Sequence, residues 1–126
     1  MFHISTHIFV PYHLQKEEVF TLSESVYLKD CPILFSMKLI GHKWKIPIIW
    51  HLLKHRDLHY NELKRQITGI TNIMLTRCLR DLERDGLVHR CDFKTNPPSV
   101  AYSLTAKGKQ LQPVLDELYT WGKALR

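Results

Sequence analysis

The segment from Thr71 to Gly86 constrains the fold of this chain more than any other, because both its ends and both its faces are marked. The Thr71 hydroxyl suits the cap of a first helical turn, and Gly86 suits the left-handed residue that ends a helix. At about 100° per residue, one arc of this helix is apolar and carries Met74, Leu75, Cys78, Leu79 and Leu82. The opposite arc carries Asn72, Ile73, Thr76, Arg77, Arg80 and Arg84. The pattern predicts an inward core face and a basic outward face.

The outward face has one acidic interruption, Glu83, while Asp81 and Asp85 fall near the seam between the two faces. A surface helix usually mixes both signs of charge around its exposed side. We therefore interpret this helix as one that lies against nucleic acid, with its N-terminal residues toward base edges and its arginines toward phosphates or guanines. The alternative is an ordinary solvated, charged face.

The distribution of charge supports that interpretation. The 126 residues are enough for one domain with a core and too few for two, and the formal net charge is +6. Residues 1–30 hold two lysines and four acidic residues, so residues 31–126 hold 16 basic and 8 acidic side chains. This surplus indicates a polyanionic partner that binds the part of the chain after residue 30.

Several other classes of protein are disfavoured. No apolar run approaches the ~18 residues that span a bilayer, and the N-terminus lacks the pattern of a signal peptide, so we expect a cytoplasmic protein with no membrane partner. The three cysteines form no C-x-x-C pair and are expected to be free thiols. His51 and His55 have metal-ligand spacing without an accompanying Glu, so we interpret them as surface groups. We expect no metal, no cofactor and no enzyme activity, because no catalytic triad spacing or phosphate loop appears.

Two helices are expected before residue 57. The first, Ile33–Ile40, follows Cys31 and Pro32 and ends at Gly41, and the second runs from His42 or Lys43 to His55. Cys31 would then lie at a helix N-terminus, where free N–H groups and the helix dipole stabilise a thiolate. The alternative for Cys31 is a buried, inert cysteine.

Residues 1–30 contain many large apolar groups without helical or strand periodicity. We expect them to form an N-terminal extension, either a short helix or an arm that packs on a partner subunit. A disordered tail is the alternative.

Residues 61–85 have the order of a helix-turn-helix. An extended link at residues 57–60 leads to Asn61, which is expected to cap a short helix, Glu62–Ile67. A turn at residues 68–70 then leads into the basic helix. Any helical hairpin can have this order of elements, so the segment that follows is needed to distinguish a helix-turn-helix from a plain helical hairpin.

Residues 87–104 are typical of a β-hairpin, with strands at 87–93 and 99–104. Directly after a helix-turn-helix, such a hairpin would be the wing of a winged helix. Its polar and basic tip, Lys94, Thr95 and Asn96, would reach backbone phosphates or the minor groove. A plain edge hairpin that covers the core is the alternative.

The last helix is expected over residues 105–125, capped by Thr105 and broken or kinked near Pro113. Its apolar stripe offers more surface than one small core can bury, which favours a two-fold dimer. The stripe consists of Leu111, Val114, Leu115, Leu118, Trp121 and Leu125.

Four blocks of this sequence resemble the HxlR-type winged-helix transcriptional regulators, which are relatives of the MarR group. The blocks are Cys31 to Ile33, Ile40 to Lys45, Gly69 to Val88, and Asn96 to Gly108 with Leu111 to Leu115 and Trp121-Gly122 behind it. Together they span residues 31–122. The family usually has Gly at position 42, often a basic residue at 73, a basic residue at 99 and Glu at 101, where this chain has His42, Ile73, Ser99 and Ala101.

The resemblance implies a mostly helical α+β fold, a winged helix-turn-helix with a two-stranded β-hairpin wing and dimerisation helices at both ends. It also implies a homodimer that binds a pseudo-palindromic operator in double-stranded DNA and acts mostly as a repressor. In several such regulators the cysteine before the first helix, here Cys31, senses oxidants or electrophiles, so a small molecule or oxidant is the expected inducer.

We therefore expect a DNA-binding regulator of transcription in which α-helical residues 71–77 face the major groove. The major-groove set is Thr71, Asn72, Ile73, Thr76 and Arg77, and the expected phosphate contacts are Lys64, Arg80, Arg84 and Lys94. The alternative is a winged-helix dimerisation or protein-interaction module without specific DNA binding.

Overall fold

The structure is a computed structural model that describes residues 31–126, so the expected packing arm of residues 1–30 lies outside the described residues. Residues 39–126 form one compact unit, and residues 31–38 lie outside it. Helix α4, Pro32–Ile40, begins before this unit and ends inside it. Its bounds agree with the prediction to within one residue.

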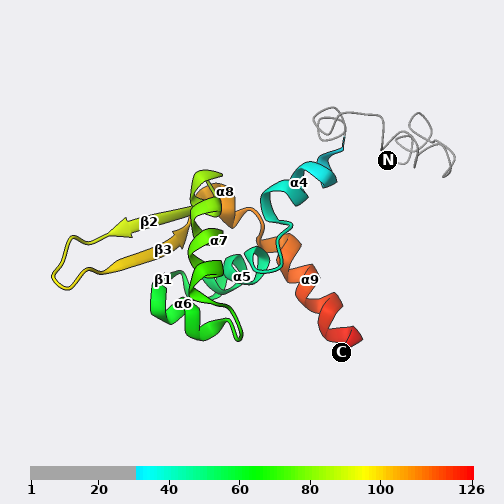
Figure 1. Ribbon diagram of the computed structural model, residues 1–126. Coiled ribbons are helices and arrows are strands. Elements are labelled where there is room, and N and C mark those ends of the chain that lie inside the picture. The colour runs from blue at the N-terminus through cyan, green and yellow to red at the C-terminus, as the bar shows by residue number, and fades with distance from the viewer. Residues whose placement is uncertain (1–30) are drawn as a thin grey trace, which may run out of the picture. The chain divides into compact units, whose positions relative to one another are not determined.

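After α4, the chain continues with five further helices and three short strands (Figure 1). The elements are α5 (Lys45–His55), β1 (Asp57–His59), α6 (Tyr60–Gln66), α7 (Asn72–Arg84), β2 (Val88–Asp92), β3 (Val100–Leu104), α8 (Ala106–Lys109) and α9 (Gln112–Leu125). The mostly helical α+β fold is therefore confirmed.

The strands form one antiparallel sheet in the order β1-β3-β2. The hairpin β2–β3 agrees with the predicted wing, and its far end extends away from the helices (Figure 1). The expected extended link before α6 is instead strand β1, in which Leu58 lies opposite Tyr102. Three residues are too short for a strand to show a period of two, so only its pairing with β3 identifies it.

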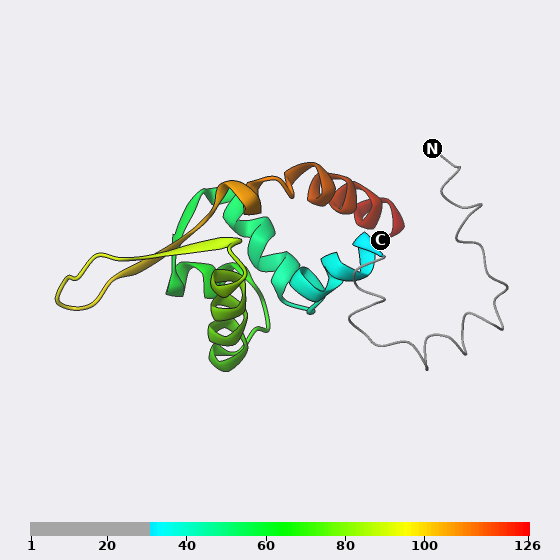
Figure 2. The ribbon, with the colours of Figure 1, turned by 90° about the horizontal axis from the view of Figure 1, so that it is seen from above.

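The core of residues 39–126 is built around α5, which lies between α7 and α9 (Figure 2). Ile48, Ile49 and Leu52 of α5 are almost fully buried. They belong to one apolar cluster with Leu63, Leu75, Leu79, Leu82, Leu104 and Leu115. Helices α7 and α9 are thus held on the same central helix.

The starts of two helices differ from the prediction. Helix α5 begins at Lys45 because residues 42–44 form a turn, in which the Lys45 N–H donates to the His42 carbonyl over 3.2 Å. Helix α6 begins at Tyr60, so Asn61 is not its cap. The Glu62 carboxylate accepts from the backbone N–H of His59 over 2.8 Å and satisfies the start of that helix.

The helix expected after Thr105, broken or kinked near Pro113, is broken into two helices, α8 and α9. The Thr105 hydroxyl caps α8 as predicted, because it accepts from the Gly108 N–H over 3.1 Å. Pro113 lies in the first turn of α9, where its missing N–H and fixed φ cost nothing. The proline therefore starts a new helix and does not bend an existing one.

Candidate nucleic-acid interface

The start and the rotation of α7 are fixed by local sequence and by burial. The Thr71 hydroxyl accepts from the Met74 N–H over 3.1 Å, so the predicted cap is present. On the inward face, four side chains have relative exposures of 2% or less, Leu75, Cys78, Leu79 and Leu82. Burying such a side chain stabilises by about 2 kcal/mol, so the helix is held with one set of residues turned outward.

That outward set is the predicted one. Asn72, Ile73, Arg77, Arg80 and Arg84 are exposed, and the Ile73 side chain is 72% exposed. They line a shallow concavity together with Thr76 and Asp81. Thr71 is also exposed, but its hydroxyl already serves the helix cap.

A second concavity joins α7 to the wing, and it adds a residue that the sequence did not identify. Arg90 of β2 lines it with Thr76, Arg80 and Tyr102. On β2, Arg90 shares the strand face of buried Val88, so alternation alone would have assigned Arg90 to the core side. Only the packing of α7 beside the sheet shows that Arg80 and Arg90 border the same hollow.

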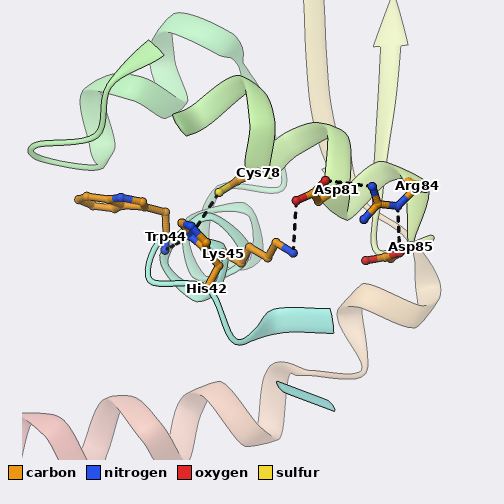
Figure 3. A network of polar contacts seen from close by, with 7 residues as sticks. All are labelled: His42, Trp44, Lys45, Cys78, Asp81, Arg84 and Asp85. Atoms are coloured by element: carbon orange, nitrogen blue, oxygen red, sulfur yellow. Dashed lines mark hydrogen bonds and ion pairs between the residues drawn. The ribbon is translucent and has the colours of Figure 1, made fainter. Parts of the chain in front are cut away.

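The three arginines of α7 differ in their acidic neighbours. Arg84 pairs with Asp81 over 3.1 Å and with Asp85 over 3.5 Å (Figure 3). Asp81 also pairs with Lys45, which is 7% exposed, over 3.6 Å and so connects α7 to α5. Within residues 31–126, no ion pair involves Arg77 or Arg80. Their charges are therefore available to a polyanion, whereas that of Arg84 is largely compensated.

Tyr60, at the start of α6, is a second residue that the sequence did not identify. Its hydroxyl lies 3.1 Å from the carbonyl oxygen of Asn72 and 3.0 Å from Oγ1 of Thr76. The Thr76 hydroxyl, expected to face a groove, is thus also engaged within the chain. No local pattern around Tyr60 indicates this contact, because it joins residues 16 positions apart.

At the wing tip, Lys94, Thr95 and Asn96 are all exposed, as expected. The Thr95 hydroxyl donates to the carbonyl of Pro97 over 2.8 Å, and the Lys94 N–H donates to the Asp92 carboxylate over 2.9 Å. These bonds order the tip and leave the Lys94 ammonium and the Asn96 amide free of partners within residues 31–126. Lys64 is half-buried on α6, beside Asn61 and Arg65.

The cysteines occupy different surroundings. Cys78 is buried, its Sγ lies 3.7 Å from Nδ1 of His42 (Figure 3), and burial raises the pKa of its thiol. Cys31 precedes α4, and its Sγ accepts from the Leu34 N–H over 3.4 Å, so it lies at a helix N-terminus as predicted. Cys91, on β2, is half-buried.

The apolar stripe of α9 is only partly free. Val114, Leu118, Trp121 and Leu125 are exposed. Leu115 is 2% exposed, so its assignment to a dimer surface is wrong. Leu111 packs against the core and offers little apolar surface to a partner. Helical periodicity marked the whole stripe as apolar and could not show that α5 already covers one edge of it.

The residues described hold no cluster of three or more side chains suited to a metal. The rings of His51 and His55 stack with their centroids 6.2 Å apart. Burial, with His55 and Lys54 nearby, lowers the pKa of His51. Among residues 31–126 no helix combines the length and the apolar character needed to cross a membrane.

Residues 39–126 match the family model described as HxlR-like helix-turn-helix. The chain belongs to this family. The match confirms the resemblance drawn from the sequence, although the block from Cys31 to Ile33 lies outside the matched residues.

Two of the relatives that resemble this chain in sequence are described as HTH-type transcriptional regulators. YdzF of Bacillus subtilis strain 168 is 41% identical over 96 residues, which cover 76% of this chain and 88% of the relative. A regulator of Halalkalibacterium halodurans is 45% identical over 95 residues, 75% of this chain and 84% of the relative. Both relatives carry the description of HTH-type transcriptional regulator, and this chain is a transcriptional regulator of the helix-turn-helix type.

Among solved structures, the redox regulator HypR in its oxidised form is similar to this chain with a TM-score of 0.72 and 41% identity. The likeness covers 76% of this chain and 98% of HypR. The winged helix-turn-helix architecture of this chain is therefore that of known members of its family.

Proposed function

We propose that this regulator is a homodimeric repressor that binds a pseudo-palindromic operator, with α7 in the major groove and the hairpin β2–β3 as the wing. The observation that carries the proposal is the outward face of α7, where Arg77 and Arg80 lie beside Asn72 and Ile73 without acidic partners. Because the opposite face is buried in the core, these side chains are presented on a rigid helix.

The chemistry of this face divides into two kinds of contact. Asn72, Ile73 and Arg77 lie toward the N-terminal part of α7, where side chains of a recognition helix meet base edges. Arg80 and Arg90 border the hollow next to the wing and suit phosphate oxygens. Lys94 and Asn96 at the wing tip add contacts to the backbone or the minor groove.

The exposed stripe of α9 supports the dimer. Val114, Leu118, Trp121 and Leu125 form an apolar surface that a second copy would remove from water. A two-fold dimer should present its two α7 helices about 34 Å apart, one turn of duplex DNA. A dimerisation module without DNA binding would share this surface, but it would have no need of the unpaired arginines on α7.

We also propose that Cys31 is the thiol that responds to an oxidant or electrophile. Its Sγ lies at the N-terminus of α4, accepts a backbone N–H and is half-buried, whereas Cys78 is buried with a raised pKa. Reactive cysteines are partly exposed, whereas buried ones are inert. The description of HypR as a redox regulator adds support from a similar protein.

The test is binding of the DNA upstream of the protein's own gene, measured by fluorescence anisotropy at several salt concentrations. The double variant Arg77→Ala/Arg80→Ala should lose at least about tenfold in affinity and show a shallower dependence on salt. The matched control, Lys54→Ala/Lys109→Ala, also removes two exposed charges but lies outside the proposed interface. Equal affinity and equal salt dependence for both double variants would overturn the proposal.

A further inference from the structure

The hydroxyl of Tyr60 contacts two residues on the outward side of α7, Asn72 and Thr76. Its Oη lies 3.1 Å from the carbonyl oxygen of Asn72, 3.5 Å from Asn72 Oδ1 and 3.0 Å from Thr76 Oγ1. The aromatic ring of Tyr60 packs against the core cluster, so the hydroxyl is carried on a fixed stem. Asn72 and Thr76 line the concavity on the outward face of α7.

The positions of two protons follow from these contacts. The carbonyl oxygen of Asn72 can only accept, so the Tyr60 O–H donates to it. The Tyr60 oxygen then remains as an acceptor, and the Thr76 hydroxyl donates its single proton to it. The reverse assignment would place the Tyr60 and Asn72 oxygens 3.1 Å apart with no proton between them, which is repulsive.

With its proton directed at Tyr60, the Thr76 oxygen offers only lone pairs to the solvent side. Thr76 lies where the two concavities meet, beside Arg77 on one side and Arg90 on the other. In a major groove, a hydroxyl that can only accept pairs with an amino group, which adenine carries at N6 and cytosine at N4. Guanine and thymine would oppose it with acceptor oxygens.

We propose that Tyr60 is a positioning residue for base recognition, because it makes Thr76 an acceptor and so selects adenine or cytosine on the strand that Thr76 faces. This inference rests on the proposed binding of α7 in a major groove. Tyr60 itself touches no DNA in this account. Its effect on the operator passes through the orientation of one hydroxyl group.

The substitution Tyr60→Phe isolates that effect, because it keeps the ring and removes only the hydroxyl. The Thr76 hydroxyl can then rotate and either donate or accept, so its preference for one class of base is lost. We expect discrimination at that base position to fall about fivefold, the usual size of one hydrogen bond, with little loss of affinity for DNA in general. Tyr119→Phe, the same change on α9, is the matched control.

The experiment selects bound duplexes from a random-sequence pool with the wild-type dimer and with Tyr60→Phe, Thr76→Val, the double variant and Tyr119→Phe. Affinities are then measured for four duplexes that differ only at the affected position. The wild type and Tyr119→Phe should enrich one motif with adenine or cytosine there. Tyr60→Phe and Thr76→Val should enrich the same motif with that position relaxed, and the double variant should add nothing to Thr76→Val.

Two results would overturn the inference while leaving the proposed function in place. One is a Tyr60→Phe motif with unchanged preference at every position. The other is a Tyr60→Phe effect that persists in the Thr76→Val background, because the hydroxyl would then act on the helix as a whole. A wild-type protein that enriches no motif would instead remove the proposed function, and the inference with it.

Discussion

Arg80 and Arg84 lie one turn apart on α7 and carry the same charge, yet their surroundings differ. Arg84 has two carboxylates within 3.5 Å, whereas Arg80 has none among the ion pairs of residues 31–126 and borders the hollow that contains Arg90. A compensated guanidinium attracts a phosphate less than a free one does. Sequence periodicity placed Arg80 and Arg84 on the same face and could not show that only Arg84 is paired with carboxylates.

The first prediction compares these two residues in DNA binding. Arg80→Ala should reduce the slope of log affinity against log salt by about one unit for each protomer, the effect of one lost phosphate contact. Arg84→Ala should change it by less than half as much, because Arg84 is already paired. Anisotropy titrations at four or more salt concentrations measure both slopes. Equal slopes for the two variants would contradict the assignment of free and compensated charge.

The second prediction concerns thiol reactivity. With a small alkylating agent at neutral pH, Cys31 should be modified first and Cys78 last, because burial covers the Cys78 sulfur and raises its pKa. Mass spectrometry of peptides after short exposures gives the order. Unfolding in denaturant should bring Cys78 to the rate of the others. If Cys31 proves slowest in the folded protein, the proposal that it is a sensor is wrong.

At the scale of elements, α8 is held against the corner between α7 and β2. The Thr105 N–H donates to the Leu87 carbonyl over 3.1 Å, and the Thr105 hydroxyl donates to the Gly86 carbonyl over 2.6 Å. Gly108 faces the same corner, and a Cβ built on it would overlap the Leu87 carbonyl oxygen. The wing therefore starts from a point where three elements meet closely.

The third prediction tests this corner. Gly108→Ala should destabilise the fold by about 1–3 kcal/mol, because the added methyl group meets backbone that cannot give way easily. Thermal unfolding followed by circular dichroism measures the change. Gly122→Ala adds the same methyl group where a Cβ meets nothing within 4 Å in the single chain. Because Gly122 lies on the proposed dimer face of α9, this control is measured in a Trp121→Asp background, where it should stabilise α9 by up to about 1 kcal/mol. If Gly108→Ala is as stable as the wild type, the backbone around Leu87 can accommodate the added methyl group and the prediction is wrong.

The elements also show where sequence reasoning succeeds and where it stops. Helix α7 could be predicted because its caps, period and two faces all lie within one short segment. Strand β1, the contact of Tyr60 with Thr76 and the place of Arg90 beside Arg80 could not, because each depends on residues far apart in the chain. The assignment of Leu115 to a dimer surface was wrong for the same reason, because Leu115 is buried against residues of α5 that lie far from it in the sequence.

At the scale of the whole molecule, α9 carries more exposed large apolar side chains than any other element of residues 31–126. Trp121 is 64% exposed and Leu125 is 69% exposed, although both are large and apolar. Water contact with such side chains is unfavourable by about 25 cal/mol for each Å² of apolar surface. A second copy would cover this surface and would also supply the second reading helix that the proposed operator with two half-sites requires.

The fourth prediction addresses that assembly. Trp121→Asp should shift the protein to monomers in sedimentation velocity, because a carboxylate cannot be buried without a partner. Affinity for an operator with two half-sites should fall by about a hundredfold, as the second site is no longer linked. Phe93→Asp, an equally drastic change on an exposed aromatic residue outside α9, is the control for the sedimentation measurement alone, because the wing belongs to the proposed DNA interface. A Trp121→Asp dimer of normal stability would place the interface elsewhere.

The central place of α5 gives that helix a further part in such an assembly. Ile48 and Leu52 belong to the cluster that holds α7, while the Trp50 ring stacks on Tyr119 of α9 with centroids 5.0 Å apart. In a dimer formed through α9, the bulk of α5 would set how far apart the two reading helices stand. Changes to the packing of α5 should therefore alter the preferred number of base pairs between the two half-sites, while the base sequence recognised in each half-site stays the same.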